Sequence, residues 1–210
     1  MGLLRDHWKQ LEGAVHPLDL AVLERPGHSF NLDFPPPAFV GDPEAPIVLL
    51  MANGGYKPGI TEAEFVEPAD QAEHIAYLRG ERREMPRRLS SYYGRGTIGD
   101  WLVAGKAVSV NAVPYRSPRL SSEPENRSIA KSLPSVAMHR RWLLEEVLPA
   151  ALAGERFLLV HRNSWWQVPR EAACATVLFS DPLRAEPNRA APDAAKLAAA
   201  ATWLQSRSDR

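Results

Sequence analysis

The sequence of 210 residues has one cysteine, Cys174, and no excess of either charge, because 25 Lys and Arg residues balance 25 Asp and Glu residues. A single cysteine cannot form a disulfide within the chain, so a fold stabilised by internal disulfides is excluded and a reducing, cytoplasmic location is expected. A formal net charge of zero gives no overall attraction to nucleic acid or to an acidic membrane surface. Any site for a polyanion must therefore be a local patch.

The chain also lacks a hydrophobic run long enough to span a membrane. Its first residues include Arg5, Asp6 and Lys9 and contain no long apolar segment, so they do not resemble a secretory signal peptide. We therefore expect no membrane partner. Cys174 lies in an apolar segment, which is typical of a buried and unreactive thiol.

Several signatures of metal and cofactor chemistry are absent from the sequence. The histidines are scattered without the spacing of metal ligands, and there is no phosphate-loop pattern and no Gly-x-Gly-x-x-Gly motif after a strand. Ser164 and Ser180 do not stand in the context of a nucleophile elbow. The sequence therefore predicts neither a metal nor a cofactor. The histidines are His7, His16, His28, His74, His139 and His161.

What the sequence does contain is an unbroken apolar run, residues 47–51, followed by Ala52, Asn53, Gly54 and Gly55. A run without polar alternation predicts a strand buried on both faces, as in parallel sheets. The glycines then form the turn at its carboxyl end, which is the edge where open α/β sheets bind ligands. The ordinary alternative is that Asn-Gly is simply a favourable turn sequence.

Three further apolar runs, residues 107–111, 157–160 and 173–179, alternate with segments of helical spacing. This alternation predicts an α/β fold with three layers (α/β/α) and a central, mostly parallel sheet of four strands. We expect a single domain over residues 1–210, in which residues 1–34 form an N-terminal helical extension. Helices are predicted at residues 3–11, 18–23, 71–79, 98–105, 135–153 and 193–204, and a mobile loop at 119–131.

Polar residues stand at the ends of the four predicted strands, namely Asn53, Asn111, His161 and Asp181. Right-handed crossovers bring the carboxyl ends of parallel strands to one edge, so these side chains are expected to line one cleft. An asparagine amide offers both a donor and an acceptor and can read the edge of a nucleobase, on which aromatic side chains can stack. Asn111 could equally be a satisfied residue at the end of a strand.

A basic segment from Arg79 to Arg88 is the densest cluster of positive charge in the chain, and Tyr92 and Tyr93 follow it closely. Arginines of this kind can supply contacts to phosphates. They can also form a solvated helix face, and the tyrosines can belong to the core.

The motifs, taken in order, resemble the uracil-DNA glycosylase superfamily, nearest in pattern to its single-strand-selective and mismatch-specific branches. Residues 51–55, Met-Ala-Asn-Gly-Gly, occupy the place of the Gly-x-Asn-Pro-Gly motif of that family, and residues 37–43 look like its lead-in. Residues 108–111 resemble the second strand, which ends in an asparagine that reads the flipped base. Several branches have an aromatic residue that stacks on the base, and Phe65 stands at the corresponding distance after the first motif. Tyr56 is the alternative for this stacking role.

Two departures from the family pattern concern catalysis. Gly54 replaces the proline of the first motif. The last motif, His-Pro-Ser-Pro in the family, corresponds to residues 179–184 of this chain. In the family its histidine stabilises the departing uracil anion. Here Ser180 or Asp181 takes the place of that histidine. An aspartate would repel that anion unless it were protonated. His161, at the end of the preceding strand, is a possible substitute, and a strand-end histidine without a catalytic role is the alternative.

The resemblance implies an N-glycosyl hydrolase that acts on a flipped, deaminated base of the uracil or hypoxanthine type, without metal or cofactor. A water held by Asn53 would attack as the glycosidic bond breaks. The implied partner is single- or double-stranded DNA, and a monomer is expected. The implied catalytic residues are Asn53, Asp181 and His161, the base-binding residues are Asn111, Phe65, Tyr56, Gly54 and Gly55, and the nucleic-acid-binding residues are Arg82, Arg83, Arg87, Arg88 and Arg184.

Three hypotheses therefore stand side by side. The chain is a DNA glycosylase of altered specificity, or a protein of the same fold that binds a nucleobase, nucleotide or nucleic acid without cleaving it. The third is an enzyme of small-molecule chemistry that uses the same strand-end cleft. The neutral net charge and the missing histidine favour binding, whereas Asn53 and Asn111 favour the glycosylase.

Overall fold

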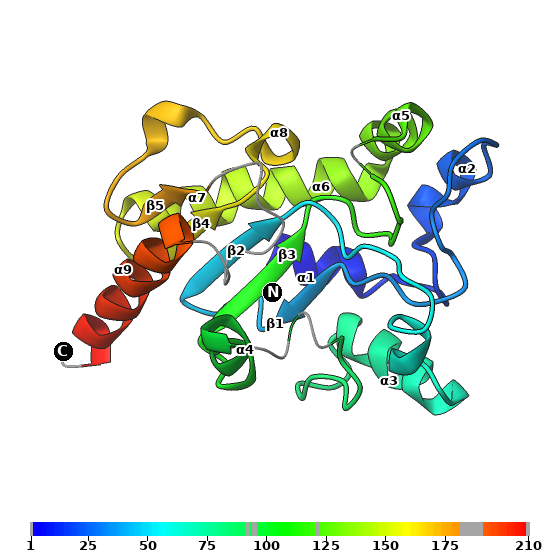
Figure 1. Ribbon diagram of the computed structural model, residues 1–210, viewed down its shortest axis with the longest axis horizontal. Coiled ribbons are helices and arrows are strands. Elements are labelled where there is room, and N and C mark those ends of the chain that lie inside the picture. Colours follow the sequence, from blue (N-terminus) through cyan, green and yellow to red (C-terminus); the bar gives the residue numbers. More distant parts are fainter. Residues whose placement is uncertain (1, 91–92, 94–95, 121, 181–190, 209–210) are drawn as a thin grey trace.

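The computed structural model describes residues 2–90, 93, 96–120, 122–180 and 191–208, and it confirms the α/β class (Figure 1). Its sheet has five strands in the order β1-β3-β2-β4-β5. The strands β3, β2, β4 and β5 run parallel, and β1 pairs with β3 in the antiparallel direction. The strands are β1 (Phe39–Gly41), β2 (Ile47–Met51), β3 (Ala107–Asn111), β4 (Phe157–Val160) and β5 (Val177–Phe179).

The central strand β2 has the two-sided burial that its sequence predicts, since all five of its residues are buried. Its side chains alternate between two clusters. Val48 and Leu50 belong to a core that includes residues of α1, α3, α6 and α7, whereas Ile47 and Leu49 contact residues of α4 and α9. Helices therefore pack on both faces of the sheet, as Figure 1 shows.

The helices cover most of the predicted positions. They are α1 (Leu3–Trp8), α2 (Leu20–Leu23), α3 (Pro68–Leu78), α4 (Gly96–Val103), α5 (Pro124–Ser132), α6 (Pro134–Trp142), α7 (Leu148–Leu152), α8 (Asn163–Trp166) and α9 (Ala191–Ser208). A π-helical segment, Leu143–Val147, joins α6 to α7. Pro149 follows it and lacks an N–H donor, which disfavours a regular α-helical ladder at this point.

Three local predictions were wrong. The sheet has five strands instead of four, because the proline-rich approach to β2 contains the three-residue edge strand β1. The predicted mobile loop at 119–131 contains most of α5, which Pro124 begins and which buries Ile129 and Ala130. Cys174 is exposed and not buried, because β5 begins only at Val177 and Cys174 lies in the turn before it.

Buried histidines connect the N-terminal segment to the sheet. Trp8 Nε1 donates to His139 Nε2 at 2.8 Å, and His139 Nδ1 lies 2.7 Å from the carbonyl oxygen of Asn111. The carbonyl can only accept, so Nδ1 carries the proton and His139 is neutral. Burial lowers the pKa of His7 to about 3 and that of His139 to about 4. Neutral histidines thus hold α1 against α6 and the end of β3.

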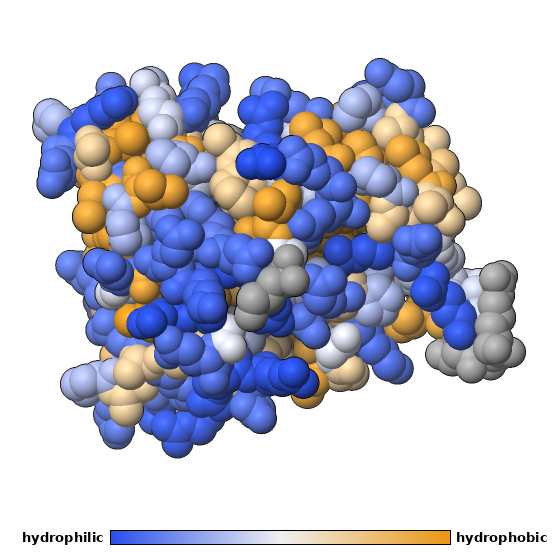
Figure 2. Space-filling view, turned by 180° about the vertical axis from the view of Figure 1, so that it is seen from behind, coloured by the Kyte–Doolittle hydropathy of each residue, from blue (hydrophilic) through white to orange (hydrophobic). Residues whose placement is uncertain are grey.

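One face of the molecule is mainly hydrophilic. Seen from behind, hydrophilic residues cover most of the molecule, and apolar groups lie mainly toward the upper edge (Figure 2). The exposed large apolar side chains come from separate elements, among them Leu18, Val66, Val103 and Leu152. Among the described residues, no helix combines the length and the apolar character that crossing a membrane requires.

Candidate functional site

A cleft with a volume of about 440 Å³ lies at the carboxyl ends of β2 and β4. We call it the strand-end cleft, and its polar lining comes from Asn53, Ser117, Arg119, Ser122, His161 and Arg162. Among the parallel strands, β2 comes first in the chain, and the next two, β3 and β4, lie on opposite sides of it. Ligands of open α/β sheets bind outside the carboxyl ends of the strands at such a reversal of strand order.

Asn53 lines the cleft, as the sequence predicts for a residue after the first strand. Its Nδ2 donates to Ser117 Oγ at 3.0 Å, and the N–H of Tyr56 donates to the Ser117 carbonyl at 3.0 Å. These two bonds tie the loop after β2 to the loop after β3. Because Nδ2 uses one of its two protons in the bond to Ser117, the amide oxygen is the acceptor with which Asn53 can orient a ligand or a water.

His161 follows β4 and lines the same cleft. Its side chain is almost fully buried, and its Nδ1 lies 2.9 Å from Ser180 Oγ, at the end of β5. The ring also borders a small pocket between the sheet and α9, lined by Leu49, Leu159 and Leu197. Asn53 and His161, which come from separate strands, therefore share one site.

The cleft carries unbalanced positive charge. Its lining includes Arg119 and Arg162 and no carboxylate among the described residues. Neither arginine has a carboxylate within ion-pair distance in that part of the chain, whereas Arg5, Arg116 and Arg141, for example, each pair with one. An anionic ligand would complete this charge balance.

The backbone of Arg162 is also unusual, because its φ of +57° lies in the left-handed region. A non-glycine residue there costs of order 1–3 kcal/mol and is found mainly where the surrounding structure requires it, often at functional sites. Arg162 immediately follows His161, so this conformation sets the direction in which the chain leaves the cleft.

Asn111 does not line the strand-end cleft, so the prediction that it shares a mouth with Asn53 was wrong. Its side chain is buried, and its Nδ2 donates to the Pro37 carbonyl at 2.5 Å and to the Tyr93 hydroxyl at 3.1 Å. Asn111 is therefore engaged inside the protein. This corresponds to the ordinary alternative, a satisfied residue at the end of a strand.

The glycines of the first motif have separate structural reasons. A Cβ at Gly54 would overlap the ring of Pro37, so the close packing of the lead-in segment against the motif requires glycine here. Gly55 has a φ of +62° and open space around it, so glycine is needed for the backbone conformation. Gly55 lines the cleft and Gly54 does not.

Phe65, the predicted stacking residue, is buried and already stacked. Its ring lies 4.9 Å from that of Phe34 at an interplanar angle of 11°, and the Arg116 guanidinium lies 5.7 Å from its centroid. Arg116 forms a buried bidentate pair with Glu64, at 3.0 and 3.2 Å. Burial raises the pKa of Glu64 despite this pairing. Tyr56 is only partly buried and remains the more accessible aromatic.

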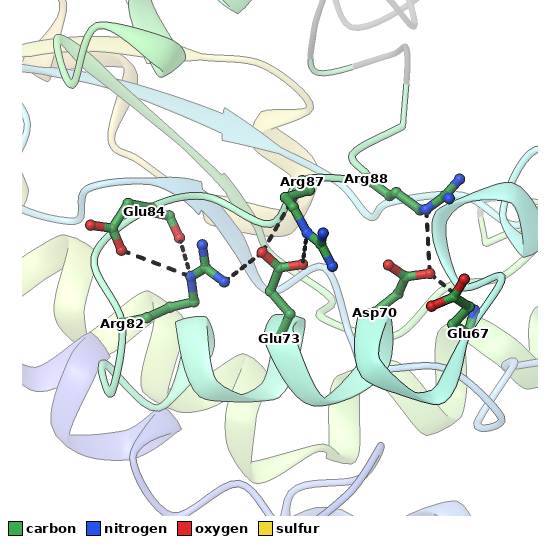
Figure 3. Close-up of polar contacts among 7 residues, drawn as sticks. All are labelled: Glu67, Asp70, Glu73, Arg82, Glu84, Arg87 and Arg88. Atoms are coloured by element: carbon green, nitrogen blue, oxygen red, sulfur yellow. Dashed lines mark hydrogen bonds and ion pairs between the residues drawn. The ribbon is translucent and has the colours of Figure 1, made fainter.

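Most arginines of the cluster form ion pairs. Arg82 and Arg87 share Glu73, and Arg88 pairs with Asp70, so two carboxylates of α3 contact three of the four predicted phosphate ligands in this cluster (Figure 3). The fourth, Arg83, is exposed and has no ion pair among the described residues. The predicted site residues Asp181 and Arg184 lie outside the described residues.

Sequence reasoning missed Ser117, Arg119 and Arg162 as parts of the cleft. Arg162 directly follows the strand-end residue His161, so the rule that identified His161 could have included it. Ser117 and Arg119 lie beyond the end of β3, and only the fold of that loop brings them to Asn53.

No model of a known protein family, no curated protein and no solved structure matches this chain. Its function must therefore be argued from the residues of the cleft.

Proposed function

We propose that the strand-end cleft binds a phosphate-bearing nucleotide, free or within a DNA strand, and hydrolyses its N-glycosidic bond. The observation that carries this proposal is that Asn53 and His161 line one cleft although they come from separate strands. On this proposal the four parallel strands form a uracil-DNA glycosylase-like core, and β1 is an added edge strand.

The charge of the cleft supports a phosphate-bearing ligand over a free base. Arg119 and Arg162 can each form charge-assisted hydrogen bonds with a phosphate, and no carboxylate of the described lining opposes them. A volume of about 440 Å³ also falls within the range of small-molecule sites.

The proposed reaction uses Asn53 and His161, two polar residues of the cleft lining. The amide oxygen of Asn53 orients a water toward the anomeric carbon, and His161 accepts a proton from that water. The water oxygen bonds to the carbon while the carbon–nitrogen bond breaks, and the base leaves with the electron pair. An easily ionised base, such as uracil or hypoxanthine, suits this departure as an anion. Neither metal nor cofactor takes part in these steps.

The residues that we expect to contact the base differ from those that the family resemblance implies. Asn111 and Phe65 are engaged by Tyr93 and Phe34, respectively. The hydroxyl of Ser117 and the backbone near Gly55 are therefore the groups that we expect to read the base, and Tyr56 is the aromatic candidate for stacking. Discrimination between bases should accordingly be weaker than in a site where an asparagine side chain hydrogen-bonds to the base.

Binding without cleavage is the second candidate function. It is favoured by the engagement of Asn111 and Phe65 inside the protein and by the lack of a carboxylate in the described lining. Under this hypothesis Arg119 and Arg162 still hold the phosphate, and the bound nucleotide remains intact.

The test combines cleavage with binding. Single- and double-stranded oligonucleotides with uracil, hypoxanthine or xanthine, and the corresponding deoxynucleoside monophosphates, are incubated with the protein. Abasic sites are then detected by alkaline cleavage, and released base by chromatography. The variant is Asn53→Ala, and the matched control is Asn31→Ala, whose Nδ2 contacts Asp33 away from the cleft.

Cleavage by the wild type and by Asn31→Ala, but not by Asn53→Ala, is the expected result. Cleavage that persists in Asn53→Ala would remove the role assigned to Asn53. Nucleotide binding without any product would support the second candidate over the first. If none of these substrates is bound or cleaved, both candidate functions are wrong.

A further inference from the structure

The segment that follows β2 is joined at both of its ends to two consecutive residues, Arg116 and Ser117. At its start, Asn53 Nδ2 donates to Ser117 Oγ and the N–H of Tyr56 donates to the Ser117 carbonyl, each at 3.0 Å. At its end, the carboxylate of Glu64 accepts two hydrogen bonds from the Arg116 guanidinium, at 3.0 and 3.2 Å. Residues 53–64, which we call the β2 loop, are therefore held at both ends by residues 116–117.

Residues 116–117 are themselves fixed from other directions. The exposed fraction is 2% for Arg116 and 2% for Ser117. The Arg116 carbonyl accepts from the N–H of Asn31 at 2.9 Å. The preceding residue, Tyr115, is fully buried, and its hydroxyl donates to Asp19 at 2.7 Å. These contacts make residues 116–117 a firm support for the β2 loop.

Stability does not account for the ion pair at the end of the β2 loop. Both partners are buried, and Arg116 Nε is a buried donor without a hydrogen-bond partner among the described residues. Burial also raises the pKa of Glu64 despite the neighbouring arginine. Replacing a buried ion pair of this kind by apolar residues of similar volume is often neutral or stabilising. What the pair supplies is a fixed geometry, because its two parallel hydrogen bonds restrict the orientation of both side chains.

We propose that Arg116 is a positioning residue for the strand-end cleft, which holds the end of the β2 loop through Glu64 and thereby keeps Ser117 against Asn53. The inference rests on the proposed function, in which the amide oxygen of Asn53 orients the water. Arg116 is not a lining residue of the cleft, so it acts through Ser117 and Asn53. A misplacement of a reacting group by about 1 Å can cost about 10²-fold in rate, so a support of this kind has a measurable effect.

The test removes the ion pair as a whole. Arg116→Met alone leaves a buried carboxylate without its partner and lowers stability. The double variant Arg116→Met/Glu64→Leu removes both charges and should recover most of the urea midpoint that the single variant loses. The matched control is Arg141→Met/Glu145→Leu, which removes an exposed ion pair elsewhere in the molecule.

Amide hydrogen exchange followed by NMR measures the position of the β2 loop without any substrate. The reporter is the N–H of Tyr56, because it donates to the Ser117 carbonyl. Releasing the far end of the β2 loop should make this amide exchange at least about tenfold faster in Arg116→Met/Glu64→Leu, because a segment with fewer buried contacts opens more often. The control double variant should exchange like the wild type at Tyr56.

The kinetic expectation is a loss in kcat with little change in KM. With a nucleotide that carries uracil, kcat should fall about 10–100-fold in Arg116→Met/Glu64→Leu, because the Asn53 amide is no longer held in one orientation. KM should change little, because Arg162 comes from another loop and the buried Leu120 still holds the segment that carries Arg119. If the ion pair served only the fold, the folded double variant would keep both constants.

The outcomes separate this inference from the proposed function. A folded double variant with wild-type exchange at Tyr56 would overturn the role of Arg116 even if hydrolysis that depends on Asn53 is observed, and so would an unchanged kcat. Faster exchange at Tyr56 supports the role even if the wild type hydrolyses no substrate, and in that case the hydrolytic function is what fails.

The wild type alone provides a second test, which does not depend on how well the double variant folds. The amides of Asn31 and Tyr56 donate to the neighbouring carbonyls of Arg116 and Ser117. If residues 116–117 are a fixed support, both amides should exchange through one opening with the same dependence on urea. Separate openings with different urea dependence would contradict the inference.

Discussion

Replacing His74 with phenylalanine is expected to stabilise the protein and to make it less sensitive to acid. His74 lies on α3 with 1% of its surface exposed, and its ring centroid is 5.5 Å from that of Phe65. Within the described part of the chain, neither ring nitrogen has a hydrogen-bond partner. Phenylalanine retains a planar ring for this contact and removes both unsatisfied nitrogens.

The magnitude has two parts. A buried polar group without a partner costs about 1–3 kcal/mol, so the variant should gain roughly this amount at pH 7.5. The second part depends on pH, because burial, and to a lesser extent the charge of Arg116, lowers the pKa of His74 to about 3 from 6.5. In the folded protein His74 therefore stays neutral at a pH at which the unfolded chain protonates it.

The sign of the pH effect follows from this difference. Between pH 6.5 and about 3 the unfolded chain binds more protons at His74 than the folded protein does, so the free energy of unfolding falls as the pH falls. The stability is fully present above pH 6.5 and is lost progressively toward pH 3. Integration from pH 7.5 to 5.0 gives a loss of about 2 kcal/mol for this one group, which His74→Phe abolishes.

Urea unfolding monitored by circular dichroism at pH 7.5 and 5.0 measures both parts. His74→Phe should exceed the wild type in the free energy of unfolding at both values, and its advantage should be about 2 kcal/mol larger at pH 5.0. The matched control His139→Phe should be less stable at pH 7.5, because it leaves Trp8 Nε1 and the Asn111 carbonyl without their partner. Equal pH dependence in His74→Phe and the wild type would show that His74 does not titrate differently on unfolding, and destabilisation at pH 7.5 would show that its unsatisfied nitrogens carry no cost.

Three further substitutions test other contacts. Arg116→Met leaves Glu64 as an uncompensated buried carboxylate and should lower the free energy of unfolding by about 3–5 kcal/mol in urea titrations; a loss below about 1 kcal/mol would contradict a buried pair. Gly54→Ala forces a Cβ into the ring of Pro37 and should cost about 1–3 kcal/mol in the same assay, and an unchanged midpoint would show that this packing is looser than described. Arg162→Gly relieves the left-handed backbone conformation, so little stability should be lost, but it also removes a positive charge from the cleft. Titration calorimetry should therefore show an affinity for the nucleotide that is reduced about 10–100-fold. An unchanged affinity would exclude a contact between Arg162 and the phosphate.

The parts of the fold that were predictable are those with a strong local signal. β2 and β3 have the predicted bounds, because an uninterrupted apolar run is compatible with burial on both faces. β1 was missed because it has three residues and follows a proline triplet, and its pairing with β3 is a tertiary contact. α5 was missed because its sequence is mostly polar, and Ile129 and Ala130 become buried only through packing with distant elements.

The site was predictable to a similar extent. The rule that residues after parallel strands meet at one edge of the sheet correctly placed Asn53 and His161 in one cleft. The same rule was wrong for Asn111, because hydrogen bonds with Pro37 and Tyr93, both distant in sequence, engage its side chain. The arginine cluster was misinterpreted for a different reason. A count of basic residues does not reveal that Glu73 lies between Arg82 and Arg87 and forms an ion pair with each.

Hydrolysis in the strand-end cleft is tested most directly by the release of free base from a nucleotide that carries uracil or hypoxanthine, followed in parallel with the binding of that nucleotide. We expect that the wild type releases base, that Asn53→Ala binds the nucleotide without releasing base, and that Arg162→Gly binds it more weakly. A wild type that neither releases base nor binds any of the nucleotides would contradict the assignment of the strand-end cleft.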